Sequence, residues 1–397
     1  MHNEAGDTSA ATMLQPGQTI RPQLSQQTAI GLIESLFGLH VKTIKELNSY
    51  DDRNYFISVD SNYDNPHIAD LWPHGYVFKV MNSMDSFKKH VDAESAIQRE
   101  LHKAGFSCPQ PVLNVRGEDN SLEKIKAEDT QEAGPGNNNY DPHSQSSLHV
   151  VRLLTYQPGS LMCEIAYTPD IMHQVGRYVG AVDRTLRDFS HPALTCHRTL
   201  WSLESVPSLT RFLYAVTDKS LQQLAEDVIN TFTREIIPKL DQFQRGVIHG
   251  DFNEQNIIVK QRPSATPGED QQYDVCAVID FGDSANSYYV FEVAITIMYM
   301  MVESSVIDPM KVGGHVLAGY LSEQPLTDVE FDSLKVCVAG RYAQSLVMGA
   351  YTYTLDEGNE YLLVTAKNGW PQLRRLWNMS QTELYDQWRQ TIQTYNM

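Results

Sequence analysis

Two short segments in the second half of the chain carry residue types suited to phosphoryl transfer. The segment VIHGDFNEQNIIV holds His249, Asp251 and Asn256, and the segment VIDFGD holds Asp280. A carboxylate on a loop can orient and deprotonate an attacking hydroxyl, and Mg²⁺ prefers carboxylate and amide oxygens as ligands. The pattern predicts that Asp251 acts on the hydroxyl, with His249 as a second catalytic residue. It also predicts that Asn256 and Asp280 bind Mg²⁺.

The spacing of these residues is more specific than either motif alone. A lone His-Gly-Asp or Asp-Phe-Gly is most often part of an ordinary turn. Asp-x-x-x-x-Asn followed by Asp-Phe-Gly, each set against an apolar strand-like run, is the arrangement of kinase catalytic machinery. No GxxxxGK[ST] occurs in the chain, so a P-loop mechanism is excluded.

A lysine and an acid in the first half of the chain are suited to binding a nucleotide. Lys79 lies in YVFKVM, whose alternation predicts a strand with the lysine on one face. It matches the kinase lysine that pairs with the α- and β-phosphates. The partner of that lysine is expected on the following helix, and we predict Glu94 in preference to Glu100.

The segment SYDDRN stands where the glycine-rich loop of a kinase would cover the phosphates, but it contains no glycine. Its candidate phosphate contacts are therefore hydroxyl, amide and backbone groups, at Ser49, Tyr50 and Asn54. Further along the chain, LLTY would form the hinge between two lobes. Leu153 and Thr155 of this run would offer backbone groups to the purine.

Two differences from protein kinases indicate the class of acceptor. Gly250 stands where a protein kinase has the arginine of H-R-D, and no A-P-E follows Asp280. There is consequently no room for an activation loop or for a protein-substrate groove built on it. A small hydroxylated metabolite is the expected acceptor.

The elements around these motifs predict an α+β chain with two lobes. Residues 1–24 form a polar leader that we expect to be disordered. Residues 25–156 predict a small N-lobe with a mostly antiparallel, five-stranded sheet and one internal helix, interrupted by a polar loop at 117–147 that we also expect to be disordered. Residues 157–397 predict a larger, mainly helical C-lobe with the catalytic loop, the metal ligands and the substrate site. This outline is the bilobal architecture of protein kinases.

Composition excludes several classes of partner. The net charge of −18, from 31 Lys and Arg against 49 Asp and Glu, argues against nucleic acid or an anionic membrane, since both require a positive surface. The five dispersed cysteines form no metal-binding spacing and predict reduced thiols in a cytoplasmic protein. The most apolar stretch, YYVFEVAITIMYMMV, is short for a membrane span and contains Glu292, so we expect a buried helix.

The motifs HGDFNEQN and DFGD, with the strand that contains Lys79, resemble the aminoglycoside phosphotransferase superfamily. Its members phosphorylate antibiotics, choline, homoserine and related hydroxyl compounds. Several longer stretches are similar to the hydroxylysine kinases within it, namely SYDDRN, VVRLLTYQPG, YYVFEVAITIMYMM, VGGHVLAGY, QSLVMGAY and VTAKNGW. The resemblance runs from about residue 28 to near the C-terminus and excludes the loop at 117–147.

This resemblance implies Mg²⁺-dependent transfer of phosphate from GTP to 5-hydroxy-L-lysine, a product of collagen breakdown, in lysine catabolism in the cytoplasm. The preference for GTP over ATP comes from the family alone. Two alternatives stay open. The chain could act on another amino alcohol, such as homoserine, choline or ethanolamine, or it could be a nucleotide-binding scaffold without catalytic activity.

A substrate with two ammonium groups and one carboxylate requires acids and at least one cation near the catalytic loop. Asp283 and Glu292 are the acids nearest to the chemistry in sequence. Glu292 has an alternative role, in which it braces the catalytic loop by accepting backbone N–H bonds. Arg341 is the candidate for the substrate carboxylate, and its alternative is an internal salt bridge.

Overall fold

The computed structural model describes residues 20–49, 51–84, 87–125, 147–195, 197–263, 271–355 and 364–395. The chain divides into two compact units. The first, called here the sheet unit, spans Gln18–Lys103 and Cys108–Pro158. The second, the helical unit, contains Ala104–Ser107 and Gly159–Met397. The α+β fold class, with an antiparallel sheet followed by a mainly helical part, is confirmed.

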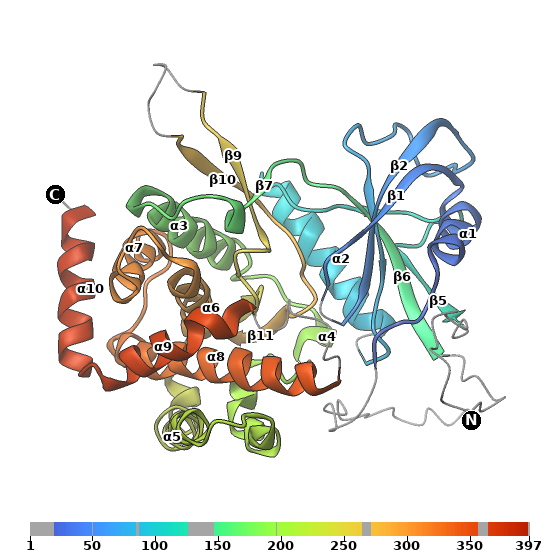
Figure 1. Ribbon diagram of the computed structural model, residues 1–397. Helices are drawn as coiled ribbons and strands as arrows, with labels where there is room; N and C mark the ends of the chain where they lie inside the picture. The colour runs from blue at the N-terminus through green and yellow to red at the C-terminus, as the bar shows by residue number, and fades with distance from the viewer. Residues whose placement is uncertain are drawn as a thin grey trace, which may run out of the picture. The chain divides into compact units, whose positions relative to one another are not determined.

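The sheet unit consists of one six-stranded antiparallel sheet and two helices (Figure 1). Its helices are α1 (Gln26–Phe37) and α2 (Lys88–Lys103). Its strands are β1 (Leu39–Leu47), β2 (Arg53–Tyr63), β3 (Tyr76–Val80), β4 (Pro111–Val112), β5 (Asn120–Ile125) and β6 (Ser147–Thr155). The strand order is β1-β2-β3-β6-β4, and β5 pairs with β6.

The alternation of side chains in β3 and β6 assigns each face of the sheet to a different helix. Phe78 and Leu153 are buried in the same hydrophobic cluster as Phe37 of α1. Lys79 and Arg152, which are directly opposite each other in the β3–β6 pairing, therefore project from the other face. Helix α2 covers that face (Figure 1). The only two cations of these two strands thus lie under one helix.

The prediction of a disordered loop at 117–147 was wrong for its first part. Asn120–Ile125 forms β5, which pairs antiparallel with β6 from Asn120 opposite Arg152 to Ile125 opposite Ser147. Asn120 and Ser121 are buried although they are polar. The segment therefore lacks the alternation of apolar and polar residues by which a strand is predicted from sequence. Residues 126–146 lie outside the described residues.

The prediction of a disordered leader also needs a correction at its end. Residues 1–19 lie outside the described part of the chain. Residues 20–24 pack on the sheet unit, where the carbonyl of Ile20 accepts from the backbone N–H of Ser83 at 3.1 Å. The side chain of Leu24 is 6% exposed and belongs to the hydrophobic cluster of the sheet. Residues 20–24 thus belong to the folded sheet unit, ahead of Ser25, which caps the start of α1 through a hydrogen bond from the N–H of Thr28 at 3.2 Å.

The helical unit contains most of the helices and three small groups of strands. Its helices are α3 (Pro169–Thr185), α4 (Pro192–Thr195), α5 (Lys219–Glu235), α6 (Tyr289–Glu303), α7 (Pro309–Leu321), α8 (Asp328–Leu355), α9 (Val364–Asn378) and α10 (Gln381–Tyr395). Short 3₁₀ helices lie at Met162–Glu164, Leu203–Arg211, Leu213–Ala215 and Ile237–Gln242. Its strands are β7 (Ser160–Leu161), β8 (Arg245–Ile248), β9 (Ile257–Gln261), β10 (Tyr273–Val278) and β11 (Ala285–Tyr288).

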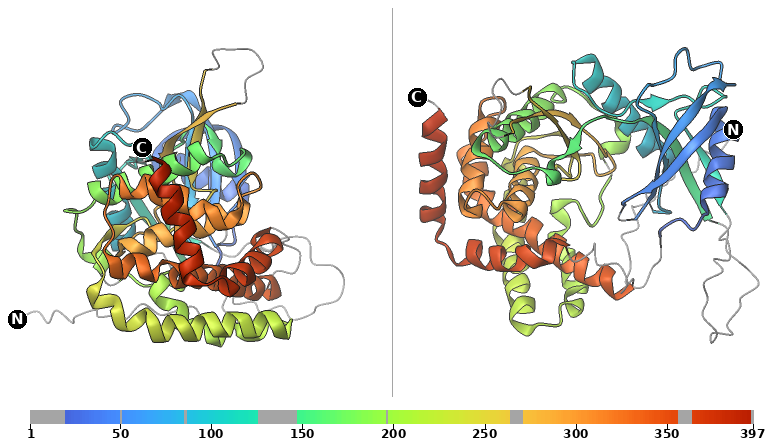
Figure 2. Two further views of the ribbon diagram at one scale, coloured as in Figure 1. Left: turned by 90° about the vertical axis from the view of Figure 1, so that its left-hand side faces the viewer. Right: turned by 45° about the horizontal axis from the view of Figure 1, so that its top comes forward.

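Helix α6 is the centre of the helical unit. It packs against α3, α7, α8 and α9, and α10 lies against α7 (Figure 2). Its residues from Tyr289 to Val302 are buried on every side, which fits a central core helix. None of the helices in the described ranges is long and apolar enough to cross a membrane. The first turn of α6 carries Glu292, which places one carboxylate deep in the apolar centre.

Candidate active site

Two strand pairs of the helical unit bring the two sequence motifs together. The loop from His249 to Asn256 connects β8 to β9, and β9 pairs antiparallel with β10. This pairing sets the start of β9 beside the end of β10, where Asp280 follows. The backbone N–H of Ile279 donates to the carbonyl oxygen of Asn256 at 2.9 Å, which fixes the two motifs to each other.

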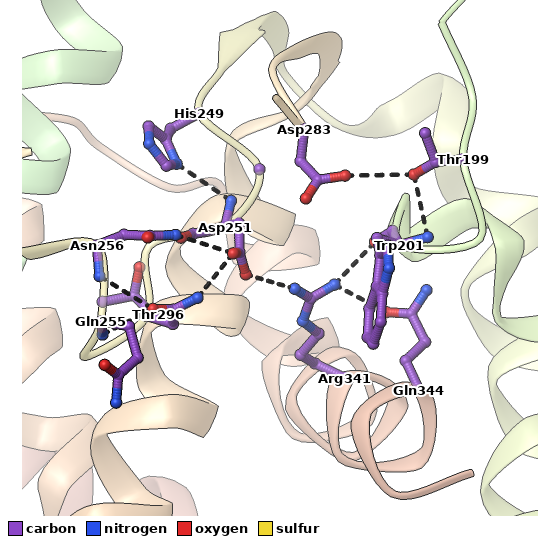
Figure 3. Close-up of polar contacts among 12 residues, drawn as sticks. Thr199, Trp201, His249, Asp251, Gln255, Asn256, Asp283, Thr296, Arg341 and Gln344 are labelled. Carbon is purple, nitrogen blue, oxygen red and sulfur yellow. Dashed lines mark hydrogen bonds and ion pairs between the residues drawn. The ribbon is translucent and has the colours of Figure 1, made fainter. Parts of the chain in front are cut away.

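The carboxylate of Asp251 is held by three side chains (Figure 3). Its Oδ2 atom accepts from the amide groups of Asn253 at 2.7 Å and Asn256 at 2.9 Å. Its Oδ1 atom accepts from Arg341 at 2.7 Å. The side chain of Asp251 remains 19% exposed. Burial raises the pKa of this carboxyl, Arg341 lowers it, and the charge of Asp280 raises it again. The carboxylate of Asp251 is therefore held in one orientation and is still partly exposed.

Glu292 braces the catalytic loop from behind. Its carboxylate accepts the backbone N–H of Gly250 at 3.1 Å and also that of His249, and the side chain is 0% exposed. Burial raises the pKa of Glu292 to about 8, although these backbone hydrogen bonds oppose the shift. These contacts match the alternative role of Glu292, in which it braces the catalytic loop through backbone N–H groups. They do not support a direct contact between Glu292 and a substrate.

His249 is also committed to the backbone of the site. One ring nitrogen, Nδ1, accepts from the N–H of Asp251 at 3.2 Å, and Nε2 lies 3.0 Å from the carbonyl oxygen of Ile279. Burial lowers the pKa of the imidazole to about 4, so the ring is neutral at physiological pH. With both nitrogens engaged, the ring links the Asp251 loop to the segment before Asp280. These contacts fit a positioning residue better than a proton carrier.

Asn256 and Asp280 have a chemistry that fits Mg²⁺. The amide nitrogen of Asn256 donates to the carbonyl and to the carboxylate of Asp251, so its carbonyl oxygen is directed elsewhere. Asp280 has a positive φ of 62°, a conformation that is uncommon outside glycine and that turns the chain sharply after β10. One carboxylate and one amide oxygen are a sufficient protein contribution for Mg²⁺ when nucleotide and water complete the octahedron.

Arg341 from α8 is the cation of this site. It is 1% exposed, and it donates to Asp251 at 2.7 Å and to the backbone carbonyl of Trp201 at 2.8 Å. Its guanidinium lies 5.2 Å from the ring centroid of Trp201 and 5.3 Å from that of Tyr299. The geometry matches the internal salt bridge that was the alternative to a substrate-binding role. The partner of that bridge, Asp251, was not anticipated.

Asp283 lies on the same side of the site as Arg341 (Figure 3). Its carboxylate accepts from the hydroxyl of Thr199 at 3.4 Å, and its charge acts on Arg341. A cavity of about 10 Å³ lies between Asp283, Trp201 and Gly250. That volume holds roughly one water molecule and not a metabolite. Asp283 stays a predicted substrate residue.

The sheet unit holds the predicted nucleotide-binding lysine in an ion pair with a residue that was not predicted. Lys79 Nζ lies 3.1 Å from the carboxylate of Asp52. Asp52 also accepts from the backbone N–H of Asn82 at 2.8 Å. Asp52 belongs to the SYDDRN segment, so this contact places the segment next to the lysine, as expected for a phosphate-covering loop.

Glu94 pairs with a second unpredicted residue. Its Oε2 atom accepts from Arg152 at 2.6 Å, and Arg152 also donates to Ser95 and Gln98. The other oxygen of Glu94 is buried with no hydrogen-bond partner among the residues that the structure describes. The pairing of Glu94 with Lys79 therefore stays a prediction. Arg152 could have been suspected from the sequence, since it is a lone cation in the apolar run VVRLL.

Four other residues predicted to bind the nucleotide lie in the sheet unit, and this role stays a prediction. The Ser49 hydroxyl donates to the carbonyl of Asp52 at 2.6 Å, and Asn54 pairs with Lys79 between β2 and β3. Leu153 is buried in β6, and the hydroxyl of Thr155 accepts from the N–H of Gln110 at 2.8 Å. Tyr50 lies outside the described residues.

Comparisons with known proteins agree with this chemistry. Residues 43–326 match the model of the phosphotransferase enzyme family. The hydroxylysine kinase of Xenopus laevis is 38% identical over 382 residues, which cover 94% of this chain and 96% of that protein. An amicoumacin kinase in complex with AMP-PNP, Ca²⁺ and Ami has a TM-score of 0.62 at 14% identity, covering 91% of this chain and 97% of that one. The GDP complex of wild-type aminoglycoside 2′-phosphotransferase-IIIa has a TM-score of 0.51 at 14% identity, covering 87% and 97%.

Proposed function

The chain belongs to the phosphotransferase enzyme family and is a homologue of the hydroxylysine kinases, and from this premise we propose that it phosphorylates 5-hydroxy-L-lysine. The phosphate donor is GTP and the acceptor is the 5-hydroxyl group. The observation that carries the proposal is the carboxylate of Asp251. It is held by Arg341, Asn253 and Asn256 and still has an exposed side.

Asp251 has the geometry to orient the acceptor hydroxyl and take up its proton. Each carboxylate oxygen has two lone pairs, so the contacts from Arg341, Asn253 and Asn256 leave acceptor capacity for one more O–H. Because these donors fix the carboxylate before substrate arrives, little reorganisation is needed when the hydroxyl attacks. Glu292 and His249 hold the backbone of the loop and act through Asp251.

The phosphates require cations and a metal. Asn256 and Asp280 would hold Mg²⁺, which neutralises charge on the β- and γ-phosphates when it is bound with the nucleotide. Lys79 would leave Asp52 to pair with the α- and β-phosphates, and Glu94 would support it through Oε1, which has no hydrogen bond among the described residues and lies 3.9 Å from Nε2 of His90. Ser49, Tyr50 and Asn54 would contact the phosphates, and the backbone at Leu153 and Thr155 would bind the purine.

The choice of GTP rests on similarity to relatives. The resemblance to the hydroxylysine kinases implies GTP, and a protein of the same fold was solved as its GDP complex. ATP is the competing donor. We place the reaction in the cytoplasm because the described cysteines Cys108, Cys163, Cys276 and Cys337 are free thiols.

Substrate recognition needs groups of both charges. Asp283 would attract an ammonium group near Asp251. Arg341 could meet the substrate carboxylate only by giving up part of its contact with Asp251, because it is 1% exposed and already hydrogen-bonded. We therefore propose Arg341 primarily as a positioning residue for Asp251.

A panel assay of the purified chain tests this function. Nucleotide turnover would be measured with Mg²⁺, GTP or ATP, and hydroxylysine, lysine, homoserine, choline, ethanolamine or an aminoglycoside. We expect turnover with hydroxylysine and GTP and none with lysine, which lacks only the acceptor hydroxyl. Turnover with a different alcohol would support the kinase mechanism and show that hydroxylysine is not the substrate. Nucleotide binding without turnover for any acceptor would favour a non-catalytic scaffold.

A further inference from the structure

The segment between β7 and α3 packs against the catalytic loop and brings polar groups together that the proposed mechanism does not use. The backbone N–H of Cys163 donates to the carbonyl oxygen of Glu254 at 3.1 Å. Glu254 lies in the catalytic loop between Asp251 and Asn256. Tyr167, in the same segment as Cys163, is 2% exposed. The segment thus delivers a buried hydroxyl to the part of the loop that follows Asp251.

Two oxygen atoms in this region are buried and unsatisfied. Within the described part of the chain, neither Oε2 of Glu254 nor the hydroxyl oxygen of Tyr167 has a hydrogen-bond partner. A buried oxygen without a donor costs folding free energy, so native proteins rarely keep one without a reason. Both atoms can accept hydrogen bonds from a ligand group that carries several donors.

The groups around these oxygens are acidic, and burial raises the pKa of Glu254 itself to about 7. Burial raises the pKa of the Tyr167 hydroxyl, and the charges of Glu254 and Glu303 raise it further. Glu303 is the last residue of α6, so a second carboxylate reaches the region from the core helix. The charge of Glu254 also acts on Tyr299, which in turn is affected by Asp251 and Arg341. The unsatisfied oxygens and the predicted catalytic carboxylate therefore share one neighbourhood.

We propose that Glu254, Tyr167 and Glu303 form a subsite for an ammonium group of the substrate. An ammonium group carries three N–H donors and no acceptor, which matches two carboxylates and a hydroxyl oxygen. Charge-assisted hydrogen bonds from such a group would satisfy both buried oxygens and neutralise the local charge. This subsite rests on the proposed function, since it assigns residues to the recognition of an amino alcohol at the same active site.

An organic cation fits this arrangement better than a metal ion. In the described ranges, no group of three or more His, Cys, Asp or Glu side chains is placed to hold a metal. A phenol oxygen and carboxylates that approach from two different elements instead suit a cation carried on an alkyl chain. Hydroxylysine carries two such cations, one on the carbon next to the acceptor hydroxyl and one at the α-carbon.

Two analogues distinguish these cations. 2-Amino-5-hydroxyhexanoic acid lacks the ammonium next to the hydroxyl, and 6-amino-5-hydroxyhexanoic acid lacks the α-ammonium. Kinetics would be measured for the wild type, Glu254→Gln, Tyr167→Phe and the exposed control Glu226→Gln. We expect Glu254→Gln to raise the KM for hydroxylysine by about 10- to 100-fold and Tyr167→Phe by about three- to tenfold. The KM for GTP should stay unchanged. The Glu254→Gln effect should vanish for the analogue that lacks the bound ammonium.

A labelling experiment tests whether an ammonium group binds next to Glu254, and it does not depend on phosphoryl transfer. Cys163 is an exposed thiol next to Glu254, whereas Cys108 and Cys337 are buried. Its alkylation by iodoacetamide would be followed by peptide mass spectrometry with and without lysine, which has both ammonium groups and no acceptor hydroxyl. We expect lysine to protect Cys163 in the wild type and in Glu226→Gln, and not in Glu254→Gln.

The outcomes separate the subsite from the proposed function. If the wild type does not phosphorylate hydroxylysine, the proposed function fails and the labelling result alone decides on the cation subsite. If the wild type is active, an unchanged KM in Glu254→Gln together with unaltered protection of Cys163 would overturn the subsite. Should Glu254→Gln fail to fold, Tyr167→Phe decides, because it removes a single hydroxyl that has no hydrogen-bond partner among the described residues. An unchanged KM there would count against the proposal.

Discussion

Each unit of this protein contains one buried arginine paired with an acid, and the two pairs differ in one respect. In the sheet unit, Arg152 and Glu94 are 1% and 2% exposed. In the helical unit, Arg341 is 1% exposed, but Asp251 is 19% exposed. The ion-pair distances are nearly the same, at 2.6 and 2.7 Å. What separates the pairs is the exposure of the acid, which is consistent with the proposed role of Asp251 and not with such a role for Glu94.

The surroundings of the two arginines explain this difference. Arg152 donates to Gln98 and Ser95 of α2 as well as to Glu94, so one helix encloses the whole pair. Arg341 is instead anchored by the carbonyl of Trp201 and by two aromatic rings, and it presents one N–H face to the catalytic loop. The first arrangement stabilises a fold. The second holds one side of a carboxylate and leaves the other side free.

The largest expected effect on stability follows from removing the enclosed cation. Arg152→Met leaves Glu94 buried without its cation, and breaking a buried pair in this way costs about 3–5 kcal/mol. Urea denaturation should show this loss, and Glu94→Gln in the Arg152→Met background should recover part of it. Arg116→Met, at a side chain that is 55% exposed, is the matched control and should change stability by less than about 1 kcal/mol. If Arg152→Met and Arg116→Met lowered the free energy of unfolding equally, the Arg152–Glu94 pair would not stabilise the fold in the way described.

The second effect is a pH dependence that belongs to the helical unit. Burial raises the pKa of Glu292 from its ordinary 4.5 to about 8. Below about pH 4.5 both the folded and the unfolded states hold the proton; between 4.5 and 8 only the folded state does. The free energy of unfolding should therefore fall as pH rises through this window, by at most about 1.4 kcal/mol per pH unit, and level off above it. Glu292→Gln should flatten this slope in denaturation series from low to high pH, and an unchanged slope would exclude Glu292 as its source.

The third effect concerns the cation of the open pair. Arg341→Met should lower kcat by about 10- to 100-fold, because Asp251 loses one of the donors that fix its carboxylate. Its cost in stability should be smaller than that of Arg152→Met, since water can reach Asp251. Steady-state kinetics and denaturation of the same samples check both statements, with the exposed Arg374→Met as control. A stability loss as large as that of Arg152→Met with normal kcat would reverse the comparison.

The smallest effect is expected at the ion pair of Lys79. Asp52→Asn removes an attraction that Lys79 must give up before it can meet a phosphate. The side chains of Lys79 and Asp52 are only 8% and 15% exposed. Because Asn at position 52 can still accept a hydrogen bond from Lys79, we expect the KM for GTP to fall by only about two- to fivefold. A rise in KM would indicate that Asp52 shapes the phosphate-covering loop more than it competes for Lys79. Binding of GDP by titration calorimetry would separate affinity from turnover.

The fold class was predicted correctly because it depends on local patterns, and local patterns also carry the prediction of the catalytic loop. Asp251 and Asn256 lie in one loop, and strand alternation places Lys79 on one face of β3. The contact between Asp251 and Arg341 joins residues 90 positions apart, and only the packing of α8 decides it. No spacing rule in the sequence reports such a contact.

The same limit applies to the elements and residues that the sequence did not reveal. Strand β5 was missed because its buried positions, Asn120 and Ser121, are polar and do not show the apolar alternation of a strand. Tyr167 and Glu254 attracted no attention because an unsatisfied buried oxygen can be recognised only when its surroundings are known. Glu292 and Arg341 were predicted as substrate residues, and their contacts instead match the structural alternatives that the sequence left open.

The most direct test of the account is a single-turnover experiment with hydroxylysine and GTP. Formation of phosphorylated hydroxylysine would be followed by quenched flow for the wild type and for Asp251→Asn, with GTP affinity measured on the same samples. We predict that Asp251→Asn binds GTP like the wild type and forms product about 10²- to 10⁴-fold more slowly. Product formation by Asp251→Asn within a few-fold of the wild-type rate would contradict the assignment of Asp251 as the group that acts on the acceptor hydroxyl.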